Sequence, residues 1–175
     1  MRQAYHVDLP YPKLDQLQPD LCAAEIIAPA YASMSSELGA ILQYLYHHFQ
    51  YTERGMEKYA TAMEDIAISE MTHFDLLGTA LIRLGVDPVF TARPPRRYDY
   101  FNTSRIAYST YPQKMLLDDI QGERMAIAQY EDMICRLRNE EVAALIQRIV
   151  MDERLHVQIL SGLLEELDSQ PSVPC

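Results

Sequence analysis

Two copies of one four-residue motif most strongly constrain how this chain can fold. Glu70-Met71-Thr72-His73 lies in the middle of a long helical pattern, and Glu153-Arg154-Leu155-His156 lies in the last helical pattern of the chain. A Glu and a His three positions apart share one face of a helix, with about 5–6 Å between their Cβ atoms. Both side chains of a pair can therefore reach one metal ion, and two such pairs predict two ions.

Two single glutamates complete this pattern. Glu37 lies in the helical pattern before the first motif, and Glu123 lies in the pattern before the second. Two helices with Glu-x-x-His and two helices with one Glu each supply the ligands of a dinuclear iron or manganese centre in a helical bundle. We assign Glu70 and Glu153 as bridging ligands and the single glutamates as terminal ligands. The six predicted metal ligands are Glu37, Glu70, His73, Glu123, Glu153 and His156.

The sequence around these residues repeats, which supports the same interpretation. Residues 37–44 and 123–130 both read E-x-x-A-I-x-Q-Y. In an antiparallel hairpin, residues equally far from the turn lie at the same height. The midpoint between the single Glu and the Glu-x-x-His falls at the turn-like stretch 52–55 in the first half, and beside the potential helix N-cap Asn139 in the second. The chain therefore predicts one helical hairpin used twice.

The helical periodicity and the helix-breaking residues predict an all-α bundle between an extended arm and a short tail. Pro29 either kinks the first helix or splits off a short leading helix, and Met34 is expected on the inward face. The expected order is an N-terminal arm (1–19), a bundle (20–167) with helices from Asp20 to about Tyr51, Met56 to Leu84, Pro112 to Arg138 and Glu140 to about Leu167, and a tail (168–175).

The stretch 85–111 has no clear period, and irregular loops of this length are unusual in compact domains. A crossover along the length of the bundle explains it and makes the second and third helices parallel. Its aromatic residues are expected to pin it to the bundle; they are Tyr98, Tyr100, Phe101, Tyr108 and Tyr111.

Some residues near the ligands are candidates for supporting roles. Tyr44 and Tyr130 each follow a single Glu by two helical turns, so we predict that they act in catalysis, either by hydrogen bonding to the site or as one-electron relays. The alternative is that they are core tyrosines with a satisfied hydroxyl.

Ligand histidines need a partner on their outer nitrogen. The height argument selects Asp119 for His156 and, more weakly, Ser33 for His73. The remaining histidines have no matching partners, so we expect them at the surface or in packing roles; they are His6, His47 and His48.

Composition excludes several other classes of function. The net charge of −10 argues against binding to nucleic acid or to an anionic membrane surface. No apolar stretch has the length of a membrane span or the form of a signal peptide. The three cysteines lie far apart and include no Cys-x-x-Cys, which argues against a rubredoxin-type iron site. We expect a soluble cytoplasmic protein.

Across residues 20–167 the chain resembles the ferritin-like superfamily of dinuclear metal carboxylate proteins. Within it, the six ligands resemble the branch that contains manganese catalase, bacterioferritin and the erythrin domain of rubrerythrin, and the phrase around Glu70 is most similar to small manganese-catalase-like and rubrerythrin-like bacterial proteins. The resemblance implies chemistry with hydrogen peroxide or dioxygen. The chain departs from rubrerythrin at Ala126, where rubrerythrin has a further Glu, and these residues contain no Cys-x-x-Cys of the kind that a rubredoxin domain uses. The complete carboxylate set resembles a ferroxidase centre.

These observations predict a redox enzyme with two iron or two manganese ions per chain that disproportionates or reduces peroxide. It is expected to form a homo-oligomer, a dimer or larger, and reduction of peroxide would require an external electron donor. The alternative is a bacterioferritin-like ferroxidase that oxidises and holds iron. A hydroxylase acting on an organic substrate ranks last, because nothing in the sequence suggests a lipid-facing or basic surface.

Overall fold

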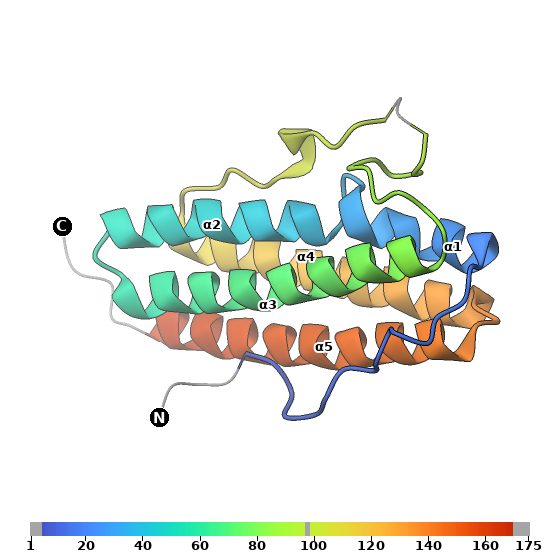
Figure 1. Ribbon diagram of the computed structural model, residues 1–175. Coiled ribbons are helices and arrows are strands. Elements are labelled where there is room, and N and C mark those ends of the chain that lie inside the picture. Colours follow the sequence, from blue (N-terminus) through green and yellow to red (C-terminus); the bar gives the residue numbers. More distant parts are fainter. Residues whose placement is uncertain (1–4, 97–98, 170–175) are drawn as a thin grey trace.

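The computed structural model describes residues 5–96 and 99–169 (Figure 1). Four long helices form a bundle of two hairpins, α2 with α3 and α4 with α5, and a short helix packs beside one end. The predicted all-α fold, two hairpins joined by a long crossover, is confirmed. The helices are α1 (Leu21–Ala32), α2 (Glu37–Glu53), α3 (Glu57–Arg83), the 3-10 turn η1 (Thr103–Arg105), α4 (Pro112–Arg136) and α5 (Glu140–Ser169).

Local sequence signals set where these helices begin and end. At the end of α3, Gly85 adopts a left-handed conformation with φ of 92°. Its N–H donates to the Ile82 carbonyl at 3.1 Å, and the Val86 N–H donates to the Leu81 carbonyl at 2.9 Å. This pair of bonds is the Schellman motif, which glycine allows without steric cost. At the start of α5, Asn139 Oδ1 accepts from the Val142 N–H at 3.1 Å, as the N-cap pattern predicts.

The first predicted helix is split in two, but the break follows Pro29 by several residues. Pro29 lies inside α1, and the break occupies residues 33–36. Ser33 leaves helical conformation, and the Ser36 hydroxyl donates to the Ser33 carbonyl at 2.7 Å. Serine side chains compete in this way for backbone groups and favour helix ends. As a consequence Met34, predicted to face inward, is 47% exposed.

The core consists of two apolar clusters. One includes residues of the end of α3 and the turn after it, between positions 77 and 86, and residues of α5 between 142 and 150, and it also buries α1. The other includes residues 59–67 of α3 and 159–167 of α5. Both Glu-x-x-His motifs lie between these clusters, so the bundle encloses a polar layer between two apolar ones.

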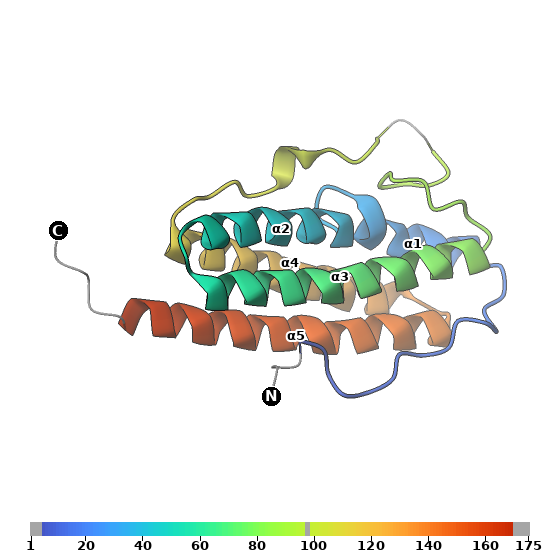
Figure 2. The same ribbon diagram turned by 60° about the vertical axis from the view of Figure 1, so that its left-hand side comes forward.

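Two irregular segments cover opposite sides of the bundle. The crossover from α3 to α4 passes over α2, and the N-terminal arm, residues 5–20, runs along α5 (Figures 1 and 2). The expectation that aromatic residues pin the crossover holds for Tyr108, whose ring lies edge-on to that of Tyr46 on α2 with 5.0 Å between the ring centres. It is wrong for Tyr100 and Tyr111, which are 57% and 77% exposed. A polar contact also fastens the crossover, because the Ala107 N–H donates to Gln43 Oε1 at 2.9 Å. Tyr98 lies outside the described residues.

The helix ends differ little from the prediction. The third predicted helix ends at Arg136, two residues early, and the fourth extends to Ser169. Residues 170–175 of the predicted tail lie outside the described part of the chain. Within that part, no helix combines the length and the apolar character needed to cross a membrane.

We predict that Leu81→Ala destabilises the fold far more than Ile82→Ala. Leu81 is fully buried in the core, whereas the adjacent Ile82 is 60% exposed. Truncation of a buried Leu costs about 2–5 kcal/mol of unfolding free energy, and surface truncations change it by about 0.5 kcal/mol. Urea unfolding of both variants measures the difference. Equal losses would contradict the packing described for α3.

Candidate metal centre

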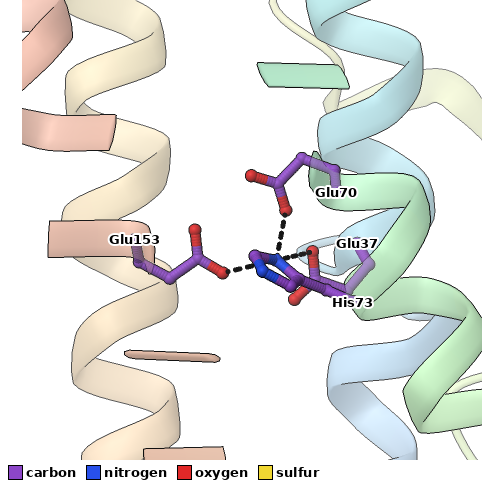
Figure 3. Close-up of side chains that lie close together, drawn as sticks. All are labelled: Glu37, Glu70, His73 and Glu153. Atoms are coloured by element: carbon purple, nitrogen blue, oxygen red, sulfur yellow. Dashed lines mark hydrogen bonds and ion pairs between the residues drawn. The ribbon is translucent and has the colours of Figure 1, made fainter. Parts of the chain in front are cut away.

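The six predicted ligand residues converge in the polar layer at the middle of the bundle. Each of the four long helices contributes at least one of them, and all are between 0% and 5% exposed. Figure 3 shows the side chains of Glu37, Glu70 and Glu153 directed at the ring of His73. Residues far apart in the sequence therefore meet at one buried point, as the repeat predicts.

The ligand atoms form two overlapping groups. Glu37, Glu70, His73 and Glu153 have ligand atoms within 4.8 Å of one another, and so do Glu70, Glu123, Glu153 and His156. Glu70 and Glu153 belong to both groups. Carboxylates that bridge two ions would have to belong to both groups, so the geometry supports the predicted bridging roles, which remain predictions.

The two histidines face the carboxylates in the same way. His73 Nδ1 lies 3.2 Å from Glu70 Oε2 and 3.1 Å from Glu153 Oε1. His156 Nδ1 lies 3.0 Å from Glu70 Oε1 and 3.1 Å from Glu153 Oε2. Each terminal glutamate is somewhat further away, with Glu37 Oε2 at 3.8 Å from His73 Nδ1 and Glu123 Oε1 at 3.5 Å from His156 Nδ1.

The donor set fits two divalent cations. Glu70 Oε1 and Glu153 Oε1 are buried, and each has a histidine Nδ1 at 3.0 or 3.1 Å. Two histidines can balance at most two of the four buried carboxylates, and a buried carboxylate that is not neutralised is costly. Four carboxylates carry four negative charges, which two divalent ions balance. Carboxylate and imidazole ligands without sulfur suit iron, manganese or zinc.

Burial and mutual charge shift the pKa values of the terminal glutamates. Burial, followed by the charge of Glu70, raises the pKa of Glu37 well above its ordinary value. Burial, followed by the charges of Glu153 and Glu70, raises the pKa of Glu123 in the same way. In the absence of a cation, both groups therefore tend to hold protons.

The histidines also bind protons more strongly. Burial alone would lower the pKa of His73, but the charges of Glu153 and Glu70 raise it well above the ordinary value. For His156, burial is likewise outweighed by hydrogen bonds to Glu123, Glu153 and Glu70. Metal binding requires neutral imidazole, so an ion that binds here would have to displace protons from this centre.

The predicted catalytic tyrosines contact the site across the two hairpins. The Tyr44 hydroxyl, on α2, donates to Glu123 on α4, and the Tyr130 hydroxyl, on α4, donates to Glu37 on α2. Burial, followed by the charge of Glu123, raises the pKa of Tyr44 well above its ordinary value, so its hydroxyl stays protonated and can donate. Their contact with the ligands agrees with the prediction, and their catalytic role remains a prediction.

The outer nitrogens of the histidines have partners that the sequence did not identify. His73 Nε2 lies 3.2 Å from Asp152 Oδ2. His156 Nε2 donates to the backbone carbonyl of Tyr5, in the N-terminal arm, at 2.8 Å. The sequence did carry one signal that could have identified Asp152. Arg148 and Asp152 form a charged i,i+4 pair on an otherwise apolar helix face.

The predicted partners Asp119 and Ser33 are wrong. Both Asp119 carboxylate oxygens lie 2.9 Å from Nδ1 of His47, which is fully buried. The Ser33 hydroxyl donates to the Ser35 carbonyl at the break between α1 and α2. The height argument placed Asp119 at the correct level of the bundle, but its side chain turns toward α2. His47 is thus a packing residue with a definite partner, and its Nε2 contacts the Ala107 carbonyl at 3.1 Å.

A cavity of about 330 Å³ connects the centre to the surface between α2 and α4. The carboxylates of the centre form its floor, and residues 105–107 of the crossover line its outer part. Small residues on the two helices leave this space open; they are Gly39, Ala40, Gly122 and Ala126. The histidine side of the centre faces α5 and the arm, so access is from the carboxylate side.

Fold and site together define a helical-bundle protein whose buried carboxylate and histidine groups could hold metal. Residues 31–169 match the ferritin-like domain family, and the chain therefore belongs to that family. No curated protein sequence matches the chain.

Solved structures share the fold. KatB, a manganese catalase from Anabaena, has a TM-score of 0.77 at 20% identity and covers 97% of this chain and 84% of its own. A bacterioferritin from Rhodobacter capsulatus has a TM-score of 0.68 at 22% identity, covering 86% of this chain and 88% of its own. The bacterioferritin BfrA of Mycobacterium tuberculosis has a TM-score of 0.72 at 21% identity, covering 86% and 89%.

We predict that metal binding releases protons and tightens as the pH rises. His73 and His156 have raised pKa values without metal, so they are protonated below those values and must become neutral to bind an ion. Affinity is therefore lost as the pH falls. Calorimetric titration with Mn²⁺ in buffers of different ionisation enthalpy should show at least about one proton released per ion. Binding without proton release would contradict these protonation states, and His6→Asn, at an exposed position, serves as the control.

Proposed function

We propose that the chain holds two iron or two manganese ions and uses them to disproportionate or reduce hydrogen peroxide. The observation that carries this proposal is the overlap of the two ligand groups at Glu70 and Glu153. Two ions bridged by carboxylates lie about 3.5–4 Å apart, close enough to act on one small molecule together. When bound, they would supply two one-electron redox equivalents, which peroxide chemistry requires.

The residues of the chain would perform the remaining tasks. The cavity between α2 and α4 admits a small molecule to the carboxylate side of the centre, where Glu37 and Glu123 lie. Disproportionation transfers two protons from one peroxide to another, and we assign this transfer to Glu37 and Glu123, which line the cavity. The hydroxyls of Tyr44 and Tyr130 hold the two carboxylates in position. On the opposite side, the arm excludes water from the histidines.

Peroxide ranks ahead of iron storage because the similarity to the manganese catalase spans nearly the whole chain, including the arm. The bacterioferritins match a smaller share of it. Ferroxidase activity remains the second candidate, and the complete set of four carboxylates and two histidines favours it. The two functions make different demands on metal content, which allows a direct test.

Elemental analysis of protein from its native source is the first measurement. About two manganese ions per chain and one dioxygen evolved for every two peroxides consumed are expected for a catalase. About two iron ions with peroxide-dependent oxidation of a donor would support the peroxidase form. Iron far above two ions per chain would support storage. No transition metal, even after anaerobic reconstitution, would refute the proposal.

We predict that Glu70→Ala abolishes binding of both ions, because Glu70 belongs to both ligand groups. Metal content should fall from about two ions per chain to a small fraction of one. Glu64→Ala changes an exposed glutamate on the same helix and should retain the metal. Circular dichroism checks that both variants fold. Retention of two ions by Glu70→Ala would rule out the site.

A further inference from the structure

The two halves of the centre differ at the residue before each motif. Asp152 precedes Glu153, and its carboxylate reaches across the bundle to the outer nitrogen of His73 at 3.2 Å. Ser69 occupies the equivalent position before Glu70. Its hydroxyl is buried and makes no hydrogen bond within the described residues. The repeat therefore does not hold at this position, because Ser69 does not supply a carboxylate for the outer nitrogen of His156.

The N-terminal arm fills this gap. The Tyr5 carbonyl accepts from His156 Nε2 at 2.8 Å, in place of a carboxylate. The arm also holds the partner of the other histidine, because Asp152 accepts from the Val7 N–H and from the Tyr11 hydroxyl, both at 2.6 Å. Both histidines thus depend on the arm, His156 directly and His73 through Asp152.

Arg148 fastens the arm to α5. Its guanidinium donates to the carbonyl of Leu9 at 3.0 Å and to that of Val7 at 2.7 Å, and it lies 4.3 Å from the centre of the Tyr11 ring. The same guanidinium pairs with Asp152 at 2.7 Å. Arm, arginine and aspartate therefore form one connected network behind the histidines.

We propose that the two metal positions are unequal, and that the position beside Glu37 and His73 binds a divalent transition-metal ion first and more tightly. A carboxylate on the outer nitrogen of a ligand histidine makes the imidazole a stronger donor than a neutral carbonyl does. Asp152 is the positioning residue for His73, and the arm is a structural part of the centre. The inference rests on the proposed binding of two ions, but not on any activity.

The test is a titration of the metal-free full-length protein with Mn²⁺ alone, followed by calorimetry. Two bound cations repel each other, so even two equal positions would fill in two separate steps. The presence of two steps therefore does not reveal which position fills first. His73→Ala and His156→Ala distinguish the positions. We expect His73→Ala to weaken the first step at least about tenfold and His156→Ala to leave it within about threefold of the wild type.

Asp152→Asn tests the proposed cause. It should weaken the first step by about 10–100-fold and leave the second within about threefold, which a general loss of structure would not do. If this variant fails to fold, Tyr11→Phe replaces it and should weaken the first step by up to about tenfold. Tyr51→Phe is the matched control, since its buried hydroxyl bonds the Pro112 carbonyl at the far end of the bundle.

The possible results separate this inference from the proposed function. Equal losses in His73→Ala and His156→Ala would overturn the inference while leaving the dinuclear site intact. Equal weakening of both steps by Asp152→Asn or Tyr11→Phe would overturn the role of the aspartate. Failure of the wild type to bind Mn²⁺, Fe²⁺ or Co²⁺ would refute the proposed function and this inference together.

Discussion

The burial of four carboxylates at the middle of a helical bundle is the constraint on which the rest of the structure depends. Charges taken out of water cost several kcal/mol each unless they are paired or bound to a cation. Glu37, Glu70, Glu123 and Glu153 meet with only two histidines among them. The apolar clusters above and below this layer hold the helices together and keep the carboxylates in place.

The centre has one open and one closed side, and this division organises the irregular parts of the chain. On the open side, small residues on α2 and α4 leave the cavity that reaches the carboxylates, and the crossover lies over it. On the closed side, the N-terminal arm lies along α5 and supports the histidines. A small molecule that enters the cavity would thus meet Glu37 and Glu123, while His73 and His156 are fully buried.

The hairpin repeat explains most of the symmetry of the centre, and its departures show where the two halves differ. Tyr44 and Tyr130 each hold the terminal glutamate of the other hairpin, so this contact obeys the repeat. The contact to the outer nitrogen of each histidine does not follow the repeat, because the position equivalent to Asp152 is Ser69, which is not acidic. A segment outside both hairpins, the arm, supplies the missing contact. The bundle alone therefore does not contain the whole centre.

The sequence by itself determined the helices apart from the position of the break between α1 and α2, their pairing into hairpins and the six residues that meet at the centre. Helical period, cap residues and the three-residue spacing of Glu and His are local patterns, and the repeat carries them into three dimensions. Only the tertiary structure decided the partners of the histidines, which lie 79 residues away for His73 and 151 for His156. Equal height on antiparallel helices predicted that Asp119 would contact His156. Its carboxylate points toward α2 and contacts His47 instead. A backbone carbonyl such as that of Tyr5 leaves no mark in the residue pattern, because every residue has one.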